Sequence, residues 1–516
     1  MIVIDHLYRI ALEHPQRLAF VSGKTKYTYS EMARLVDQIA CLLTEKGCLP
    51  GTPVAVLSPN DPLAFACVLG VLRAGACWVP INQRNSPTAN ADFLKHVGCR
   101  AMFFHGSLRD DIEIFQRLLP DLQTLLQIDG SQKELGTIAN LLGQQKKQIV
   151  KAMDDIDRIS IIVGTGGTTG APKAVTWTES TWRALLAAAT ESMPVCTPPV
   201  HLCVAPMTHA AGVLAMMLMP DGATSITMDR VDPLEIMKRI QEEQITHLYL
   251  PPTLLYLMLG HPEVRNFNYS SLKYFLITAA PVAPHRLIEA TRVFGPVMAQ
   301  CYGQSEAPML CTFFSPFELG QAAANGDIEK LASCGRPTSG VEVGVMSPSG
   351  DLLKPGEIGE IVVRGELVMR GYLNDPEATK EVSAYGWHHT GDIGRVDESE
   401  FVYIMDRKKD MIISGGFNVY PGEIEKIILT NSAVRDCAVI GVPHDKWGEA
   451  VKAVIELKDG KQTTETEILA LCRGALGGVK TPKSVEFVDQ LPRSAAGKVL
   501  KRELRSVYWT GKSQVI

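Results

Sequence analysis

The sequence predicts an α/β protein with a large N-terminal domain of α/β layered subdomains, a small β subdomain and a small α+β C-terminal domain. Strand and helix signals alternate with short connections over most of the chain. From Gly340 to Gly365 the pattern changes to alternating strands and turns. A run of five charged residues, 406–410, then precedes a stretch of mixed α and β pattern. A chain of 516 residues is also too long for one core.

The first 150 residues are expected to contain a parallel sheet. Ser30 is expected to cap a helix whose apolar residues recur through Leu43. A strand at 54–57, a helix at 64–74 and a second strand at 75–80 follow one another with short connections. This β–α–β order predicts that the two strands run in the same direction.

The stretch Gly164–Ala174 contains four glycines, three threonines, a proline and a lysine. It lies between a strand expected at 159–163 and an extended segment at 175–177, and a helix is expected only at 179–191. Glycines let backbone N–H groups approach an anion, threonine hydroxyls add donors, and Lys173 adds positive charge. This composition suits phosphate binding, although the loop alone leaves a flexible surface loop as an alternative. It is not a Walker A loop, because its lysine follows proline and precedes alanine.

The middle of the chain continues the alternation of helices and strands. The expected elements are a helix at 233–243, a strand at 247–250, a helix at 252–259, a strand at 275–279 and a helix at 284–294. The charged run connects two apolar strands, 401–405 and 411–414, so we place the domain boundary there; a charged hairpin tip is the alternative. The domains are therefore expected at 1–408 and 409–516.

The C-terminal domain is expected to begin with a helix at 421–429 that has proline in its first turn. Strands are expected at 438–442 and 452–457. Thr464 and Glu467 match a capping box for a helix that runs through Arg473.

Composition and charge exclude several classes of function. The chain is 46% hydrophobic and 21% charged, as in ordinary folded proteins, and its formal net charge of −5 offers no basic surface for nucleic acid. No apolar run reaches the length of a membrane-spanning helix, and the N-terminus does not match a secretory signal. Twelve cysteines without a C-x-x-C pair predict neither a zinc ribbon nor a redox site. We expect a cytoplasmic enzyme; the oligomeric state stays open, with a homodimer as one alternative.

The Gly/Thr loop is accompanied by further motifs in a fixed order. These motifs are Tyr302-Gly303-Gln304-Ser305-Glu306, Trp387-His388-His389-Thr390-Gly391-Asp392, Asp406-Arg407-Lys408-Lys409-Asp410, Ser414-Gly415-Gly416, and Pro492-Arg493-Ser494-Ala495-Ala496-Gly497-Lys498. Together they resemble the adenylate-forming superfamily of acyl-CoA and aryl-CoA synthetases, adenylation domains and luciferases. The resemblance covers essentially the whole chain and is most like fatty- or aryl-acid:CoA ligases. It implies a mobile C-terminal lid, and ATP, Mg²⁺ and coenzyme A as cofactors.

The resemblance implies a role for each matching residue. In the first step, a carboxylic acid and ATP would give acyl-AMP and pyrophosphate; in the second, coenzyme A would displace AMP. The implied catalytic residues are Lys498, His209, Glu306 and Ser305, with Glu306 also the Mg²⁺ ligand. The implied ATP-binding residues are Thr165, Gly166, Gly167, Thr168, Thr169, Gly170, Lys173, Ala279, Ala280, Pro281, Cys301, Tyr302, Gly303, Asp392, Ile404 and Arg407. The implied hinge is Lys409, and the implied coenzyme A contacts are Gly415, Gly416, Trp447 and Lys480.

Plain structural roles are the alternatives for these residues. Lys498, Glu306 and Asp392 could be surface charges, Tyr302 and His209 could be core residues, and Trp447 could pack within the lid. The sequence also departs from the family pattern, because Gly166 replaces a hydroxyl residue, Ala174 a glycine, and Phe417 a glutamate. None of these departures removes a charged catalytic group.

The stretch 206–212 is expected to line the acyl pocket. It contains no acid that could pair with a buried ammonium group, so an α-amino acid is not the expected substrate. His209 is followed by small residues, which suggests a roomy apolar pocket for a fatty or aromatic acid. The leading expectation is therefore an acyl-CoA synthetase. An adenylating enzyme that loads an acyl carrier protein and a non-catalytic nucleotide-binding relative are the alternatives.

Overall fold

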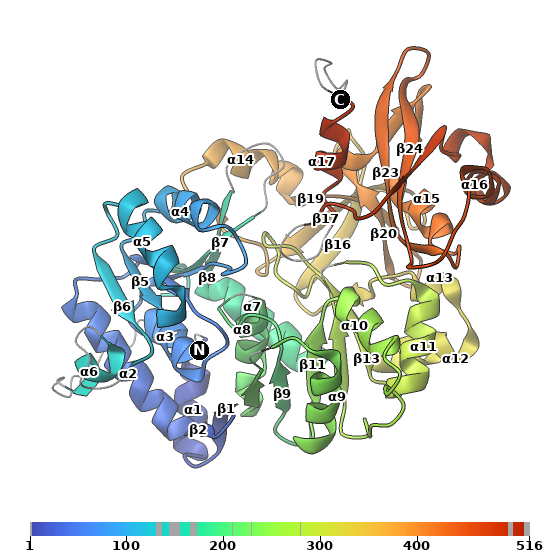
Figure 1. Ribbon diagram of the computed structural model, residues 1–516. Coiled ribbons are helices and arrows are strands. Elements are labelled where there is room, and N and C mark those ends of the chain that lie inside the picture. Colours follow the sequence, from blue (N-terminus) through green and yellow to red (C-terminus); the bar gives the residue numbers. More distant parts are fainter. Residues whose placement is uncertain are drawn as a thin grey trace. The chain divides into compact units, whose positions relative to one another are not determined.

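The computed structural model describes residues 3–130, 137–143, 155–165, 173–208, 210–228, 230–278, 280–493 and 499–509. Contacts group the chain into two compact units, Met1–Val343 with Val363–His388, and Gly344–Val362 with His389–Ile516. Many elements of both units are labelled in Figure 1. Helices and sheets are mixed throughout, which confirms the predicted α/β class. The expected hinge division between 408 and 409 concerns movement and stays a prediction.

A nine-stranded sheet forms one half of the first unit. Its strands, in spatial order, are β15 (Arg336–Pro337), β14 (Thr312–Phe314), β13 (Met298–Tyr302), β12 (Tyr274–Ile277), β11 (His247–Leu250), β9 (Val200–Cys203), β10 (Thr224–Thr227), β1 (Leu18–Ser22) and β2 (Thr25–Thr28). The six strands from β13 to β1 run parallel, and the outer ones pair antiparallel. The carboxyl ends of β9 to β13 therefore lie at one edge.

A seven-stranded sheet forms the other half. Its order is β18 (Gly371–Tyr372), β8 (Ala174–Thr178), β7 (Ile159–Gly164), β4 (Cys77–Pro80), β3 (Pro53–Leu57), β5 (Ala101–Phe104) and β6 (Thr124–Gln127). β3 and β4 are parallel, as the β–α–β pattern predicts. β7 and β8 are antiparallel, which confirms that the Gly/Thr loop joins strand to strand.

Helix α3 (Pro62–Arg73) lies between the two sheets and contacts both β1 and β3. Its residues from Ala64 to Leu72 are all buried. A helix that is enclosed on every side is apolar all round, which explains the apolar composition of this one. The other helices of this unit are α1 (Asp5–Glu13), α2 (Tyr29–Glu45), α4 (Pro87–His96), α5 (Arg109–Leu118), α6 (Ile138–Gly143), α7 (Glu179–Ser192), α8 (Ala210–Met217), α9 (Pro233–Glu242), α10 (Pro252–Leu259), α11 (Pro284–Phe294), α12 (Pro316–Asn325), α13 (Ile328–Leu331) and α14 (Pro376–Glu381).

The expected cap of α2 at Ser30 is wrong. The helix begins at Tyr29, and Thr28 is its cap. The hydroxyl of Thr28 accepts from the backbone N–H of Glu31, and the Glu31 carboxylate accepts from the backbone N–H of Thr28 at 2.8 Å. This reciprocal pair satisfies two N–H groups, whereas Ser30 lies inside the first turn.

The second unit contains most of a four-stranded sheet and all of a five-stranded one. The first has the order β16 (Val341–Met346), β17 (Gly359–Gly365), β19 (His388–Val396) and β20 (Val402–Arg407). The second comprises β22 (Phe417–Val419), β21 (Ile412–Ser414), β24 (Gly448–Leu457) and β23 (Val434–His444), with β25 (Ser484–Val488) parallel to β24. The predicted strands at 438–442 and 452–457 therefore lie within the two longer, paired strands of one hairpin.

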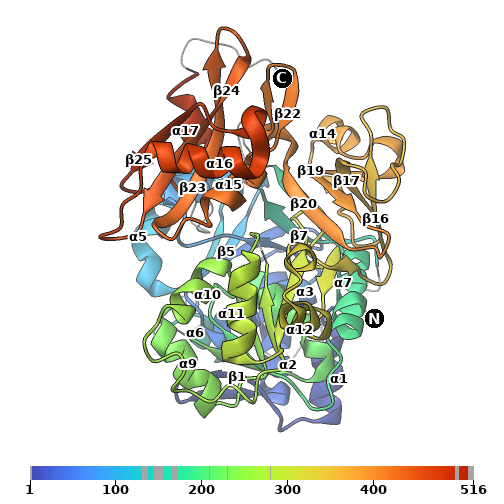
Figure 2. The ribbon, with the colours of Figure 1, turned by 90° about the vertical axis from the view of Figure 1, so that its right-hand side faces the viewer.

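The five-stranded sheet has a core on each face, because its side chains alternate. Cys437 and Val439 point to one core, and Ala438 and Ile440 to the other. Helices α15 (Pro421–Ile428) and α16 (Glu465–Lys480) lie side by side over the first face (Figure 2), and residues of α17 (Lys501–Ser506) pack against the second core. The predicted capping box of α16 is confirmed, but the helix continues past Arg473 to Lys480, with a kink at Gly477.

Candidate functional site

Predicted site residues follow three parallel strands at one edge of the nine-stranded sheet. The acyl-pocket stretch follows β9, Ala280 and Pro281 follow β12, and the stretch Gly303–Glu306 follows β13. Neighbouring strands are about 4.8 Å apart, so β9 and β13, which are separated by β11 and β12, lie about 14 Å apart. This span suits an extended ligand that lies across the carboxyl ends of the strands.

The implied ATP-binding residues that follow β12 or lie on β13 differ in how their side chains are placed. Ala280 and Pro281 are exposed, whereas Tyr302 and Cys301 on β13 are buried. Burial raises the pKa of the Cys301 thiol to about 12, and Thr278 hydrogen-bonds it. Cys301 can therefore offer a ligand little beyond its backbone. Gly303 is required by packing, since a Cβ there would lie 2.4 Å from the backbone nitrogen of Met309.

Glu306 and Lys173 meet at the same tyrosine, Tyr372. The Tyr372 hydroxyl donates to Oε1 of Glu306 at 2.9 Å, and Nζ of Lys173 lies 4.7 Å from the centre of the Tyr372 ring. The cause is strand pairing: β18 pairs with β8, which begins directly after Lys173. Burial and the Glu306 charge raise the pKa of Tyr372, so its hydroxyl stays protonated and donates. The structure thus brings together Lys173, the residue predicted to bind phosphate, and Glu306, the predicted metal ligand.

The neighbouring Ser305 is also held in place. Nε1 of Trp177 on β8 donates to the Ser305 carbonyl at 2.7 Å. The backbone N–H of Met369 donates to the Glu306 carbonyl at 2.7 Å. The segment after β13 continues from a strand of the nine-stranded sheet, but its hydrogen bond to Trp177 ties it to the seven-stranded sheet.

Tyr372 was missed by the sequence reasoning. It belongs to a two-residue strand, and neither its spacing nor its neighbours resemble a motif. The only signal in the sequence is a polar aromatic residue beside glycine, which is common. Its role depends on a pairing between strands almost 200 residues apart, since Thr176 donates to the Gly371 carbonyl with a separation of 195 residues.

In the second unit, Asp392 and Arg407 form an ion pair. They face each other in the register of β19 and β20, and Nε of Arg407 lies 2.8 Å from Oδ1 of Asp392. Asp392 is only 3% exposed, so the guanidinium offsets part of the cost of burying its charge. A second contact runs from Arg407 to the Thr390 carbonyl at 3.3 Å. Ile404 lies on the same strand, β20.

The predicted hinge has ties on two sides. Lys408 pairs with Glu360 of β17 at 3.0 Å, whereas Arg505 of α17 donates to the Lys409 carbonyl at 3.1 Å and pairs with Asp410. Burial lowers the pKa of Lys409. Lys408 is therefore tied to β17, whereas the backbone of Lys409 is tied to α17, and the hinge is predicted at this point.

Gly415 and Trp447 lie together, as a shared ligand site requires. The Gly415 N–H donates to the Trp447 carbonyl at 2.9 Å, and a Cβ on Gly415 would lie 3.4 Å from the indole. Gly415 and Gly416 have φ of +60° and +82°, a region that favours glycine. Trp447 stacks on His444 with ring centres 4.3 Å apart. Lys480 pairs with Glu423 at 2.6 Å, so its charge has a partner within the unit.

Several predicted residues lie outside the described residues. They are Gly166, Gly167, Thr168, Thr169, Gly170, His209, Ala279 and Lys498. The ends of the Gly/Thr loop are described, and the Thr165 N–H donates to the Lys173 carbonyl at 2.9 Å.

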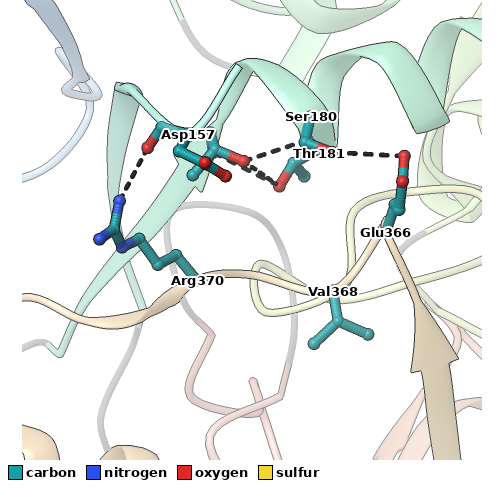
Figure 3. Close-up of a pocket in the computed structure, with 7 residues that line it drawn as sticks. Asp157, Ser180, Thr181, Glu366, Val368 and Arg370 are labelled. Atoms are coloured by element: carbon teal, nitrogen blue, oxygen red, sulfur yellow. Dashed lines mark hydrogen bonds between the residues drawn. The ribbon is translucent and has the colours of Figure 1, made fainter. Parts of the chain in front are cut away.

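The first unit also has a surface hollow of about 500 Å³. It is lined by Asp157, Thr178, Ser180, Thr181, Glu366, Val368 and Arg370. Figure 3 shows Arg370 donating to the Asp157 carbonyl and Ser180 donating to Glu366. The described residues that line it include none of the predicted site residues.

The described part of the chain contains no group of three or more His, Cys, Asp or Glu that could hold a metal ion. A single carboxylate such as Glu306 is enough for Mg²⁺, which often binds one protein carboxylate and takes its other ligands from water and substrate phosphates. The described helices also include none that is long and apolar enough to span a membrane.

Known proteins resemble this chain over nearly its full length. Residues 7–373 match the model of the AMP-binding enzyme family, and residues 423–498 match that of the AMP-binding enzyme C-terminal domain. A medium/long-chain-fatty-acid–CoA ligase of Mycobacterium tuberculosis is 32% identical, covering 99% of this chain and 91% of that protein. A feruloyl-CoA synthase of Amycolatopsis sp is 34% identical, covering 96% of this chain and 97% of that protein.

Solved structures are also similar to this chain over nearly its full length. The amide bond synthetase McbA from Marinactinospora thermotolerans superposes with a TM-score of 0.88 at 28% identity, covering 98% of this chain and 100% of that chain. ATP-bound MatB from Rhodopseudomonas palustris gives 0.88 at 28% identity, covering 98% and 99%. The predicted resemblance is confirmed: the chain belongs to the AMP-binding enzyme family.

Proposed function

We propose that this chain is an ATP-dependent acid:CoA ligase that forms an acyl-adenylate from a fatty or aromatic acid and transfers the acyl group to coenzyme A. The observation that carries the proposal is the meeting of Lys173 and Glu306 at Tyr372. The first step brings two anions together, so it needs a cation and a metal-binding carboxylate at one place. The named ligases among the relatives support the same reaction class.

Each residue has a task in the first step. Lys173 would bind the outer phosphates of ATP, and Glu306 would hold Mg²⁺, which supplies positive charge to the leaving pyrophosphate. Asp392 would accept the ribose hydroxyls while Arg407 holds its carboxylate in place through their ion pair. His209 and Lys498 would act at the acid and the α-phosphate. Buried Tyr302 would offer a ring edge to adenine.

Fatty and aromatic acids are both substrates to test, because relatives named for each kind match at 32% and 34% identity. The acid substrate can be identified by incubating the enzyme with ATP, Mg²⁺, coenzyme A and a panel of fatty and aromatic acids. Mass spectrometry then identifies the thioesters formed. We expect a CoA ester from one class. Accumulation of acyl-AMP without a CoA ester would contradict the proposal and favour an acyl carrier protein as the acceptor. Assay with chelated metal tests Mg²⁺, and a cytoplasmic location stays a prediction of the sequence.

Trp447 supplies a test of the second step. Replacing it with alanine removes a large aromatic face beside Gly415 and is expected to raise the KM for coenzyme A about tenfold. Acyl-AMP formation should keep its rate, because no first-step residue contacts this tryptophan by our assignment. Trp447→Phe is the matched variant and should retain most of the affinity. Equal losses in both steps would show that the indole only stabilises the fold.

A further inference from the structure

Asn60 joins the two sheets of the first unit. It follows β3 of the seven-stranded sheet, and its amide reaches the residues that follow β9 and β10 of the nine-stranded sheet. Oδ1 accepts from the Met207 N–H at 2.8 Å. Nδ2 lies near four carbonyl oxygens, those of Ala205 at 3.1 Å, Cys203 at 3.3 Å, Met228 at 3.3 Å and Val204 at 3.5 Å. Only a group that donates on one side and accepts on the other satisfies this environment.

The backbone of Asn60 is held firmly on its own side. Asp61 caps α3, and its Oδ1 accepts from the backbone N–H groups of Leu63 at 2.7 Å and Ala64 at 3.2 Å. Because α3 is enclosed between the sheets, the position of the Asn60 amide is set by the core of the unit.

The segment that Asn60 binds, 203–208, is held from the opposite side by α8. A Cβ on Gly212 would lie 2.0 Å from the Met207 carbonyl oxygen and 3.0 Å from the Phe65 ring of α3. α8 therefore packs directly on Met207, while Asn60 binds the N–H of the same residue. This segment overlaps the beginning of the stretch 206–212, which is expected to line the acyl pocket.

We propose that Asn60 is a positioning residue that sets the acid specificity of the enzyme. The inference rests on the proposed function, and it adds that the acyl pocket is located by a hydrogen-bonded strut from the other sheet. Asn60 has no contact with the acid. It fixes the backbone from which the pocket side chains project, so a change at Asn60 alters the fit of the acid and leaves the ATP site in place.

Asn60→Asp places a carboxylate oxygen against the carbonyls that now face N–H groups, and Asn60→Ser shortens the side chain. With either variant the KM for the preferred acid is expected to rise about tenfold, the factor for loss of a buried hydrogen bond, and the KM for ATP to stay within about twofold. The ratio of kcat/KM between good and poor acids should fall. Asn60→Ser serves if Asn60→Asp does not fold.

The matched control is Asn90→Asp. Asn90 is a buried amide of the same unit, and its Nδ2 donates to the Asn82 carbonyl at 2.9 Å, away from 203–208. This variant should lower the stability of the protein but leave the ratio of kcat/KM between good and poor acids unchanged. Equal changes of both KM values in the Asn60 variants, or an unchanged acid preference, would overturn the inference.

Hydrogen exchange without any substrate separates this inference from the proposed function. Asn60→Ser should exchange faster at 203–208 than the parent protein, with other segments unchanged. Unaltered exchange at 203–208 would contradict the inference that Asn60 holds this segment in place. Failure of the parent enzyme to form acyl-AMP from any acid would instead overturn the proposed function.

Discussion

Lys498→Ala is expected to abolish acyl-adenylate formation and to spare the second step. Lys498 ends the motif 492–498, and an ammonium there would stabilise the charge that moves from the acid and α-phosphate towards pyrophosphate. Removing a group that binds only developing charge costs about 10²–10³-fold in rate. Thioester formation from preformed acyl-AMP no longer involves that charge, so it should continue.

Pyrophosphate release measures the first step, and the thioester formed from synthetic acyl-AMP measures the second. Lys461→Ala is the control, because Lys461 is an exposed lysine of the same unit that matches no motif. Pyrophosphate release at the parental rate in Lys498→Ala would contradict the assignment. A parallel loss of both steps would indicate a folding defect, which thermal unfolding of the variant would reveal.

The described residues on either side of 494–498 are held by specific contacts. Arg493 and Val499 form an antiparallel bridge, and Arg493 pairs with Asp436 at 2.7 Å. Lys501 pairs with the half-buried Glu425 at 2.8 Å. The chain on both sides of residues 494–498 is thus held to the five-stranded sheet and α15.

Local structure could be predicted well wherever the sequence contains strong boundary signals. Proline marks the start of α10 and α11, and both helices have the predicted bounds. The strand β11 also has its predicted bounds. The cap of α2 was misplaced because Thr28 and Ser30 are both good caps, and only the contact with Glu31 distinguishes them.

The division into two sheets could not be predicted in the same way. β1 pairs with β10 across about 200 residues, and β18 pairs with β8 across a similar distance. Such pairings depend on the packing of the whole unit. The apolar run at 64–74 predicts a helix, but nothing in it states that the helix lies between two sheets.

The candidate site shows the same limit. Charged residues within motifs, such as Glu306 and Asp392, could be assigned from the sequence because the chemistry needs their charge. Tyr372 and Asn60 carry no charge, and their importance depends on partners far away in the sequence. Sequence reasoning therefore identified groups expected to touch the substrate and missed those that hold such groups in place.

Glu306→Gln tests the metal site with a nearly isosteric change. The amide can still accept from the Tyr372 hydroxyl, which now donates to Oε1 at 2.9 Å, so the variant loses charge and little structure. We expect acyl-AMP formation to fall about 10²–10³-fold, because the neutral amide binds Mg²⁺ weakly and the pyrophosphate charge is less well offset. Pyrophosphate release measured against Mg²⁺ concentration should show a higher requirement.

Tyr372→Phe is the matched variant, since it removes the hydrogen bond and keeps the carboxylate. The loss of one hydrogen bond to a charged group predicts a fall of about tenfold, with the Mg²⁺ requirement unchanged. The aromatic face near Lys173 is retained in this variant. If Glu306→Gln showed the parental Mg²⁺ dependence, Glu306 would not be the metal ligand, and its role would reduce to holding Tyr372. If both variants raised the Mg²⁺ requirement equally, the hydroxyl and the carboxylate would act as one unit in binding the metal.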